Sequence, residues 1–185
     1  MRARIVLTRP GGYVSIVCPS ENAIRFMGCG GRWTDRPRGW LDEQIDRQIA
    51  AGHCRIATPR YVRAMAFGGL SSQEALAVIR DRDCAHRGSG IELWDADEIP
   101  SDRWFRDAWR RSQNGGPIRI DLKAARPIQF QKIRHAVDAE NKRRYEDLER
   151  FDRPVEPNFI NLKSAILAAK DEIELRHVWP KELTQ

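Results

Sequence analysis

Three carboxylates close to one another form the first group of residues that could do chemistry. Asp95, Asp97 and Glu98 come at the end of GIELW, a predicted strand, so they would gather at the end of that strand. Grouped carboxylates can bind metals or act as acids and bases, but they specify a reaction only with partner groups in defined roles. The sequence has neither G-x-S-x-G nor H-E-x-x-H. We therefore expect a solvated turn and no catalytic residues, and a metal-dependent enzyme using this turn is the weakest alternative.

Four cysteines and four histidines form the second group. Zinc sites are recognised by ligand pairs at short spacing, such as C-x-x-C. The cysteines lie far apart and contain no such pair: Cys18, Cys29, Cys54 and Cys84. His53 and His86 lie beside two of them without completing that spacing. We expect free, buried thiols in a reducing cytoplasm, and neither a metal nor a cofactor.

Two glycine-rich segments could be considered for phosphate binding. A phosphate loop needs a strand before the glycines and a helix after them. GCGG at 28–31 follows a predicted helix, and GSG at 88–90 precedes a predicted strand. In these positions, the glycines of both segments are predicted to form helix ends and turns and not a phosphate loop.

Basic residues are concentrated near the N-terminus. The net charge is +6, and residues 1–60 hold ten arginines against five Asp and Glu. Arginines neutralise phosphates and an exposed tryptophan can stack on a base, so this region could bind nucleic acid. The candidate contacts surround the first glycine-rich segment: Arg25, Arg32, Trp33, Arg36 and Arg38.

The N-terminal part of the chain predicts a small sheet covered by short helices. ARIVLTR and YVSIVCP flank Pro10-Gly11-Gly12, which is typical of a β-hairpin. Helices are predicted after Ser20, over 40–51, after the N-cap Thr58, and after a capping box at Ser71 and Glu74. GIELW at 90–94 should complete a three-stranded antiparallel sheet.

The stretch SDRWFRDAWRR at 101–111 raises a choice between a core segment and a nucleic-acid surface. Trp104 and Ala108, like Phe105 and Trp109, are four residues apart, which predicts a helix capped by Ser101 and packed on the sheet. Its arginines, Arg110 and Arg111 among them, should face solvent. Because the aromatic residues form a stripe, we expect them to be mostly buried.

The C-terminal part predicts a helical hairpin. After the short strand PIRIDL and the capping residue Asp121, a long helix should extend over 127–151, with Pro127 beginning or kinking it. A last helix should carry its apolar face at intervals of three and four: Phe159, Leu162, Ile166, Ala169 and Ile173. The apolar stripe of the long helix is interrupted by polar residues that should project toward a protein partner: Glu140, Lys142, Arg143 and Arg144.

Four segments resemble a family of small phage and prophage proteins of alphaproteobacteria, often encoded near tail genes. They are VLTRPGGYVSIVCPS, IELWDADEIPSDRWFRDAWR, IRIDLKAARPIQFQKIRHA and ELRHVWPKEL, about a third of the chain. The family motif D-x-x-x-[IL]-P-x-D-R-x-F-R-x-A-W falls here on Asp95, Ile99, Pro100, Asp102, Arg103, Phe105, Arg106, Ala108 and Trp109. Residues 20–86 depart from the shortest family members. The resemblance implies no catalytic residues. It implies an association with tail assembly, because members of the family are often encoded near tail genes.

Together these observations predict an α+β fold, with a three-stranded antiparallel sheet under covering helices in residues 1–121 and a helical hairpin in 122–185. No apolar run reaches the length of a membrane span, so we expect no membrane partner and a location in the host cytoplasm or the virion. The expected function is that of a non-enzymatic phage or prophage protein that binds another phage protein, for example as an accessory factor in tail or tail-fibre assembly. The alternative is a basic module that binds nucleic acid or a host nucleoprotein.

Overall fold

The computed structural model describes residues 3–37, 39–146 and 153–183. The chain forms two compact units, which we describe separately. The N-terminal unit comprises 1–101 and 110–118, and the C-terminal unit comprises 102–109 and 119–185. The predicted domains, 1–121 and 122–185, differ from these units chiefly in 102–109, which pack with the C-terminal helices.

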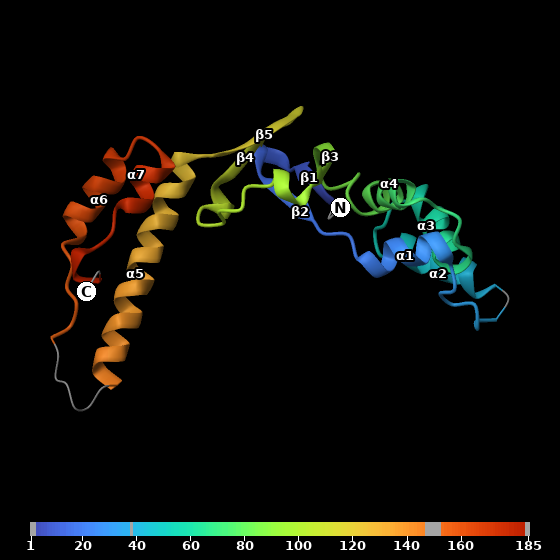
Figure 1. Cartoon of the computed structure of the whole chain (residues 1–185), viewed down its shortest axis with the longest axis horizontal. Helices are drawn as coiled ribbons and strands as arrows, with labels where there is room; N and C mark the ends of the chain where they lie inside the picture. The colour runs from blue at the N-terminus through green and yellow to red at the C-terminus, as the bar shows by residue number, and fades with distance from the viewer. Residues whose placement is uncertain (1–2, 38, 147–152, 184–185) are drawn as a thin grey trace. The chain divides into compact units, whose positions relative to one another are not determined.

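The N-terminal unit contains the predicted three-stranded antiparallel sheet, in the order β2-β1-β3 (Figure 1). Its strands are β1 (Ala3–Thr8), β2 (Val14–Val17) and β3 (Ser89–Asp95). Ile5 of the central strand lies opposite Val17 on one side and Leu93 on the other. A central strand is covered on both edges, and Ile5, like the three residues that follow it, is fully buried. The hairpin and the α+β class are confirmed.

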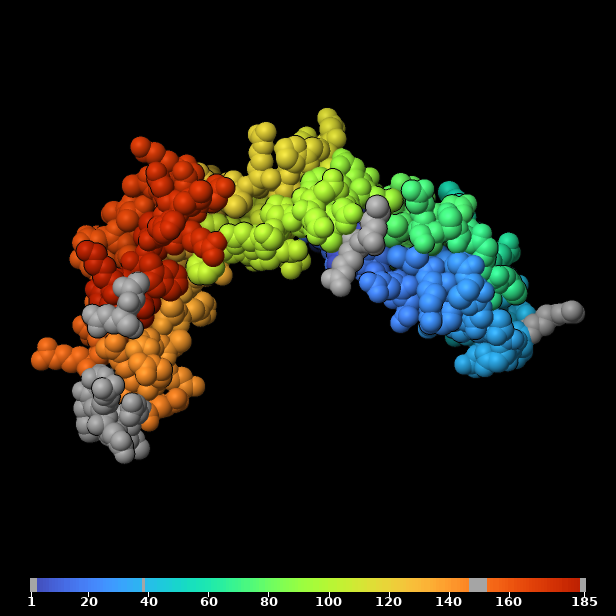
Figure 2. Space-filling model, viewed as in Figure 1, coloured from blue at the N-terminus to red at the C-terminus, as the bar shows by residue number. Residues whose placement is uncertain are grey.

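Four helices, coloured blue to green in Figure 2, complete this unit: the first, third and fourth share a core with the sheet, and the second packs against the third. They are α1 (Glu21–Cys29), α2 (Trp40–Ala50), α3 (Ala57–Phe67) and α4 (Ser72–Asp83). Their shared core joins the sheet to helices α1, α3 and α4: Ile5, Leu7, Met27, Ala64, Met65, Ala75, Val78, Ile79 and Cys84. The helix starts at Ser20 and at the Ser71–Glu74 capping box are confirmed. Thr58 is not an N-cap, because α3 begins one residue earlier and the Thr58 hydroxyl donates to the Cys54 carbonyl at 2.7 Å.

The helix predicted over 101–109 is wrong. The Asp102 carboxylate accepts a hydrogen bond from the Trp104 N–H at 2.8 Å, a local turn that competes with a helix. One 3-10 turn (Arg106–Ala108) follows, and the chain then extends into β4 (Trp109–Ser112), which pairs with β5 (Gly115–Ile120). The expected burial is confirmed for Phe105 and Trp109, while Trp104 is half-buried.

Arg111 is buried, contrary to the expectation that it faces solvent. In a strand, alternate residues share a face, so Arg111 lies on the same side of β4 as Trp109. Its guanidinium forms an ion pair with Glu92 at 2.5 Å and donates to the carbonyls of Gly116 and Gly90 at 2.6 and 2.8 Å. Hydrogen bonds from the Trp94 indole and then from Arg111 lower the pKa of Glu92. This carboxylate therefore balances a charge that would otherwise be costly to bury.

The C-terminal unit is built on a long helix, α5 (Leu122–Glu146), with α6 (Phe159–Ala168) and α7 (Glu172–His177) packed along it (Figure 1). Asp121 caps α5 by accepting from the Lys123 N–H at 2.9 Å, so the helix begins before Pro127 rather than at it. The core of the unit comprises Phe105, Ala108, Ala125, Ile133, Val137, Val155, Ile166, Ala169 and Leu175. Among the described helices, none is long and apolar enough to cross a bilayer.

The hairpin is consistent with the prediction, but its two apolar stripes are only partly correct. The predicted last helix is interrupted, because the chain leaves the helical conformation at Ala169 and Asp171 caps the separate helix α7. Ile173 is consequently 64% exposed instead of continuing the stripe. On the long helix, Tyr145 is 87% exposed. Residues 147–152, which end the predicted helix, lie outside the described residues.

Candidate functional site

The acidic turn uses two of its three carboxylates to cap its own backbone. Asp95 accepts a hydrogen bond from the Ala96 N–H at 2.8 Å, and Glu98 accepts one from the Asp95 N–H at 2.6 Å. Asp97 is exposed. These bonds give Asp95 and Glu98 the roles of a capping box.

The cysteines differ in exposure, and the prediction that all are buried is wrong. Cys18 and Cys29 are exposed, Cys54 is half-buried and Cys84 is buried. Burial, followed by the charge of Asp83, raises the pKa of the Cys84 thiol, which keeps it protonated at neutral pH. Across residues 3–37, 39–146 and 153–183, no three His, Cys, Asp or Glu side chains lie close enough together to hold a metal ion.

The first glycine-rich segment joins the C-terminal ends of α1 and α3. The Gly31 and Arg32 N–H groups donate to the Ala66 and Met65 carbonyls at 2.9 and 3.1 Å, and the Gly69 N–H donates back to Gly28 at 2.9 Å. We call this arrangement the glycine clasp. A side chain at its two central glycines would overlap backbone atoms, with Cβ at 2.6 Å from Phe67 for Gly30 and at 2.7 Å from Cys29 for Gly68. The prediction of helix ends and turns is thus confirmed for this segment.

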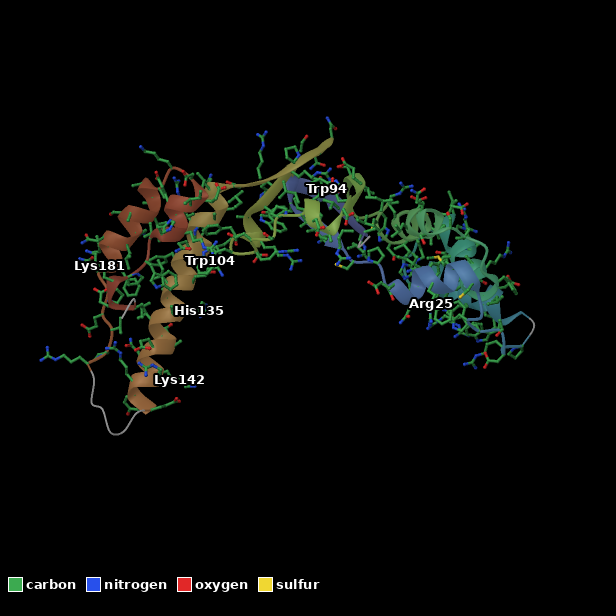
Figure 3. All side chains as sticks on the ribbon, in the orientation of Figure 1. Arg25, Trp94, Trp104, His135, Lys142 and Lys181 are labelled. Atoms are coloured by element: carbon green, nitrogen blue, oxygen red, sulfur yellow. The ribbon has the colours of Figure 1, made fainter. Side chains whose placement is uncertain are left out.

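An arginine and aromatic surface surrounds the glycine clasp. The guanidinium carbons of Arg25, Arg32 and Arg36 lie 5.1, 5.3 and 5.5 Å from the ring centres of Phe26, Trp33 and Trp40, respectively. The rings of Trp33 and Trp40 pack at 5.4 Å. Arg25, labelled on α1 in Figure 3, is exposed like the other two arginines. The structure therefore brings together four of the five predicted nucleic-acid contacts, and Arg38 lies outside the described residues.

A hollow of about 290 Å³ opens beside this surface, between the loop before α2 and the end of α3. Trp33 and Arg36 line it together with three residues that the sequence did not single out: Asp42, Arg63 and Phe67. Phe67 is 71% exposed, which is unusual for a phenylalanine at the end of a packed helix. In the sequence, the one feature that pointed to an exposed Phe67 was its position directly before two glycines.

The four predicted protein-interaction residues lie near the C-terminal end of α5, where Figure 3 labels Lys142. Three of them bond to one another, since Glu140 accepts from Arg143 and Arg144 at 2.8 Å each. Lys142 forms an exposed ion pair with Glu146 at 3.7 Å. Arg144 also donates to the Arg153 carbonyl at 2.9 Å, so this cluster ties α5 to the segment before α6. Whether these residues contact a partner stays a prediction.

Glu140 gives a pH-dependent contribution to stability. Hydrogen bonds from Arg143 and then Arg144 hold its pKa at about 2, below the ordinary value of 4.5. Because the folded state has the lower pKa, this stabilisation is complete above pH 4.5 and is lost as the pH falls to about 2. Between these pH values, the melting temperature of the wild type should fall more steeply than that of Glu140→Gln. Asp138→Asn, an exposed change on the same helix, serves as the control, and equal pH profiles for Glu140→Gln and the wild type would contradict the assignment.

Helix α6 presents a second apolar surface, which we call the α6 face. Seven of its ten residues are apolar and only Lys163 is charged, yet in α6 only Ile166 is buried. Ile160 and Leu167, seven residues apart on one side, are 79% and 58% exposed. The sequence FINLKSAILA already indicated an additional apolar surface, because it contains more apolar residues than the predicted inward-facing stripe uses.

Comparisons with protein-family models, with curated proteins and with solved structures found no match to this chain.

Proposed function

We propose that this chain is a non-enzymatic interaction protein of a phage or prophage, and that it binds another phage protein through the α6 face. The observation that carries the proposal is the exposure of Ile160 and Leu167 on a helix with a single charge. A helix that is apolar on all sides is normally buried. Here Leu162 and Ile166 pack inward, and the opposite side has nothing over it among the described residues.

The energetics favour a protein surface as the occupant. Fully burying an exposed isoleucine or leucine side chain contributes about 1.5–3 kcal/mol, so two such residues in one row can serve as the anchors of an interface. Their spacing of seven residues suits a second helix laid along α6, because residues seven apart repeat on one side of a helix. The nearby polar residues would then form the rim of that contact.

The resemblance supports a phage protein as the partner. Two of its four segments meet inside the C-terminal unit, where Trp104 and Trp179 pack edge to face with ring centres 6.1 Å apart. Residues 20–86, where the chain departs from the shortest family members, lie in the N-terminal unit. Three of the four segments contribute to the C-terminal unit and one, VLTRPGGYVSIVCPS, lies in the N-terminal unit. On this balance we assign a function shared with the family, such as a role in tail or tail-fibre assembly, to the C-terminal unit.

The α6 face can be tested by changing its two anchors together. A tagged chain with Ile160→Asp and Leu167→Asp should lose the phage tail protein that the wild type captures from cells producing the phage. Both positions are exposed, so the melting temperature should stay close to that of the wild type. Ile56→Asp is the matched control, since Ile56 is 89% exposed but belongs to the N-terminal unit. Undiminished capture by the double variant would refute the proposal.

A further inference from the structure

We propose that the hollow beside the glycine clasp binds single-stranded nucleic acid, with a base stacked on Phe67 and phosphates held by Arg36 and Arg63. This inference concerns the N-terminal unit and goes beyond the function proposed for the α6 face. It develops the basic region of the sequence into a site with assigned roles, and it adds two residues from α3 to those on the loop before α2.

Phe67 offers the open ring that stacking needs. It is the last residue of α3, and the crowded glycines that follow and face it hold the end of the helix in place. Arginines already lie over the rings of Phe26, Trp33 and Trp40. Within the described residues, by contrast, Phe67 makes no ring or cation contact and is 71% exposed. Proteins that bind single strands use such aromatic platforms beside cationic grooves.

The arginines around the hollow are available for a ligand. Cations often cap the carbonyls at the end of a helix, but in the glycine clasp backbone N–H groups bond the carbonyls of Ala64, Met65 and Ala66. Arg63 is exposed and forms no ion pair within the described part of the chain. The contact of Arg36 with Asp35 spans 4.0 Å, and an exposed pair at this distance contributes little. Arg36 and Arg63 thus outnumber the single lining carboxylate, Asp42.

The backbone at Trp33 indicates that the wall of the hollow is built to a particular shape. Trp33 has a φ of 64°, and in the described backbone it is the one residue other than glycine with a positive φ. A bulky side chain rarely adopts this conformation, which is strained and persists where surrounding contacts hold it. Here the conformation places the indole against Trp40 and beside Arg32.

The combination favours an unpaired strand over an acidic peptide or a duplex. An acidic peptide would use the arginines but would leave the Phe67 ring without a role. In a duplex the base faces are stacked on one another, whereas an unpaired strand exposes base and phosphate together. A hollow of about 290 Å³ that joins one open ring to two arginines matches this last arrangement.

The test is the binding of a fluorescein-labelled 15-nucleotide oligo-dT, followed by anisotropy across salt concentrations. The wild type should bind at low salt, with an affinity that falls as salt rises. Phe67→Ala should weaken binding about tenfold, as expected for the loss of one stacked base, and Phe67→Trp should restore it. Arg36→Gln with Arg63→Gln should reduce the slope of log affinity against log salt by about 1.4, at roughly 0.7 for each phosphate of a single strand.

Matched controls come from the C-terminal unit. Tyr145→Ala removes an aromatic side chain that is 87% exposed, and Arg134→Gln removes an exposed arginine from α5. Neither should change binding. The inference is overturned if the wild type fails to bind at low salt, if Phe67→Ala binds as tightly as the wild type, or if the controls weaken binding equally. It is also overturned if a poly-glutamate peptide competes as well as unlabelled oligo-dT, because the surface would then recognise acidic protein.

Discussion

Gly68→Ala should destabilise the N-terminal unit by more than about 3 kcal/mol. Gly68 has φ 76° and ψ −153°, a region that is essentially restricted to glycine and costs other residues of order 1–3 kcal/mol. The added Cβ would also lie 2.7 Å from three backbone atoms, in Gly28, Cys29 and Gly30. None of these atoms can move without opening the glycine clasp, so the steric cost adds to the conformational one. Urea denaturation followed by circular dichroism measures the change.

Gly69→Ala separates the two costs. Gly69 also has a positive φ, 92°, but an added Cβ would have no atom within 4 Å. This variant should therefore lose only about 1–2 kcal/mol, the conformational cost of a side chain at positive φ. If both variants lose the same free energy of unfolding, the close approach of α1 and α3 does not matter for stability.

The elements of the N-terminal unit could be predicted because their signals are local. Ser20 accepts from the N–H three residues ahead, and Ser71 and Glu74 cap each other, so a few adjacent letters are enough to show where these helices begin. The hairpin is similar, since its turn lies between its two strands. Thr58 shows the limit of this reasoning, because its hydroxyl bonds the Cys54 carbonyl within a helix that had already begun.

The stretch at 101–112 was misassigned because two patterns compete in it. Aromatic residues four apart predict a helix, but the Asp102 side chain forms a turn and Trp109 to Ser112 pair with a strand that comes later. Arg111 then lies in a strand, and its partner, Glu92, is 19 positions earlier. An ion pair between a buried arginine and a partly exposed glutamate far away in the sequence leaves no mark in the local sequence. Burial of the aromatic residues was nevertheless predictable, since it depends on residue type more than on the element.

The candidate surfaces also combine residues that are close in the sequence with residues that only the fold brings together. Arg25, Arg32, Trp33 and Arg36 lie within twelve positions, so their proximity could be anticipated from the sequence. Arg63 and Phe67 join them only because the glycine clasp brings the end of α3 against the end of α1. On α6, Ile160 and Leu167 lie outside the predicted inward stripe and had no predicted role, although both are exposed.

Gln129→Leu should cost the C-terminal unit about 3 kcal/mol, although leucine has a similar size. Gln129 is fully buried on α5 beside Trp104, which Figure 3 labels next to this helix. Its Oε1 accepts from the Trp104 indole at 2.8 Å, and its Nε2 donates to the carbonyls of Val178 and Arg176 at 2.9 and 3.4 Å. One amide thus joins the segment after residue 101 and the end of α7 to the long helix. Leucine would fill the space but would leave the indole N–H and the Val178 carbonyl unbonded, at about 1–3 kcal/mol each.

The neighbouring residue provides the control for this prediction. Gln131 is exposed on the same helix, so Gln131→Leu should change stability by less than about 0.5 kcal/mol. Urea denaturation of both variants, followed by tryptophan fluorescence, compares them directly, because Trp104 and Trp179 both lie in the affected region. A midpoint for Gln129→Leu equal to that of Gln131→Leu would mean that packing, and not the buried amide, holds these segments on α5. The unequal outcome would explain why a polar residue lies at the centre of an otherwise apolar core: its amide joins the segment after residue 101 and the end of α7 to the long helix.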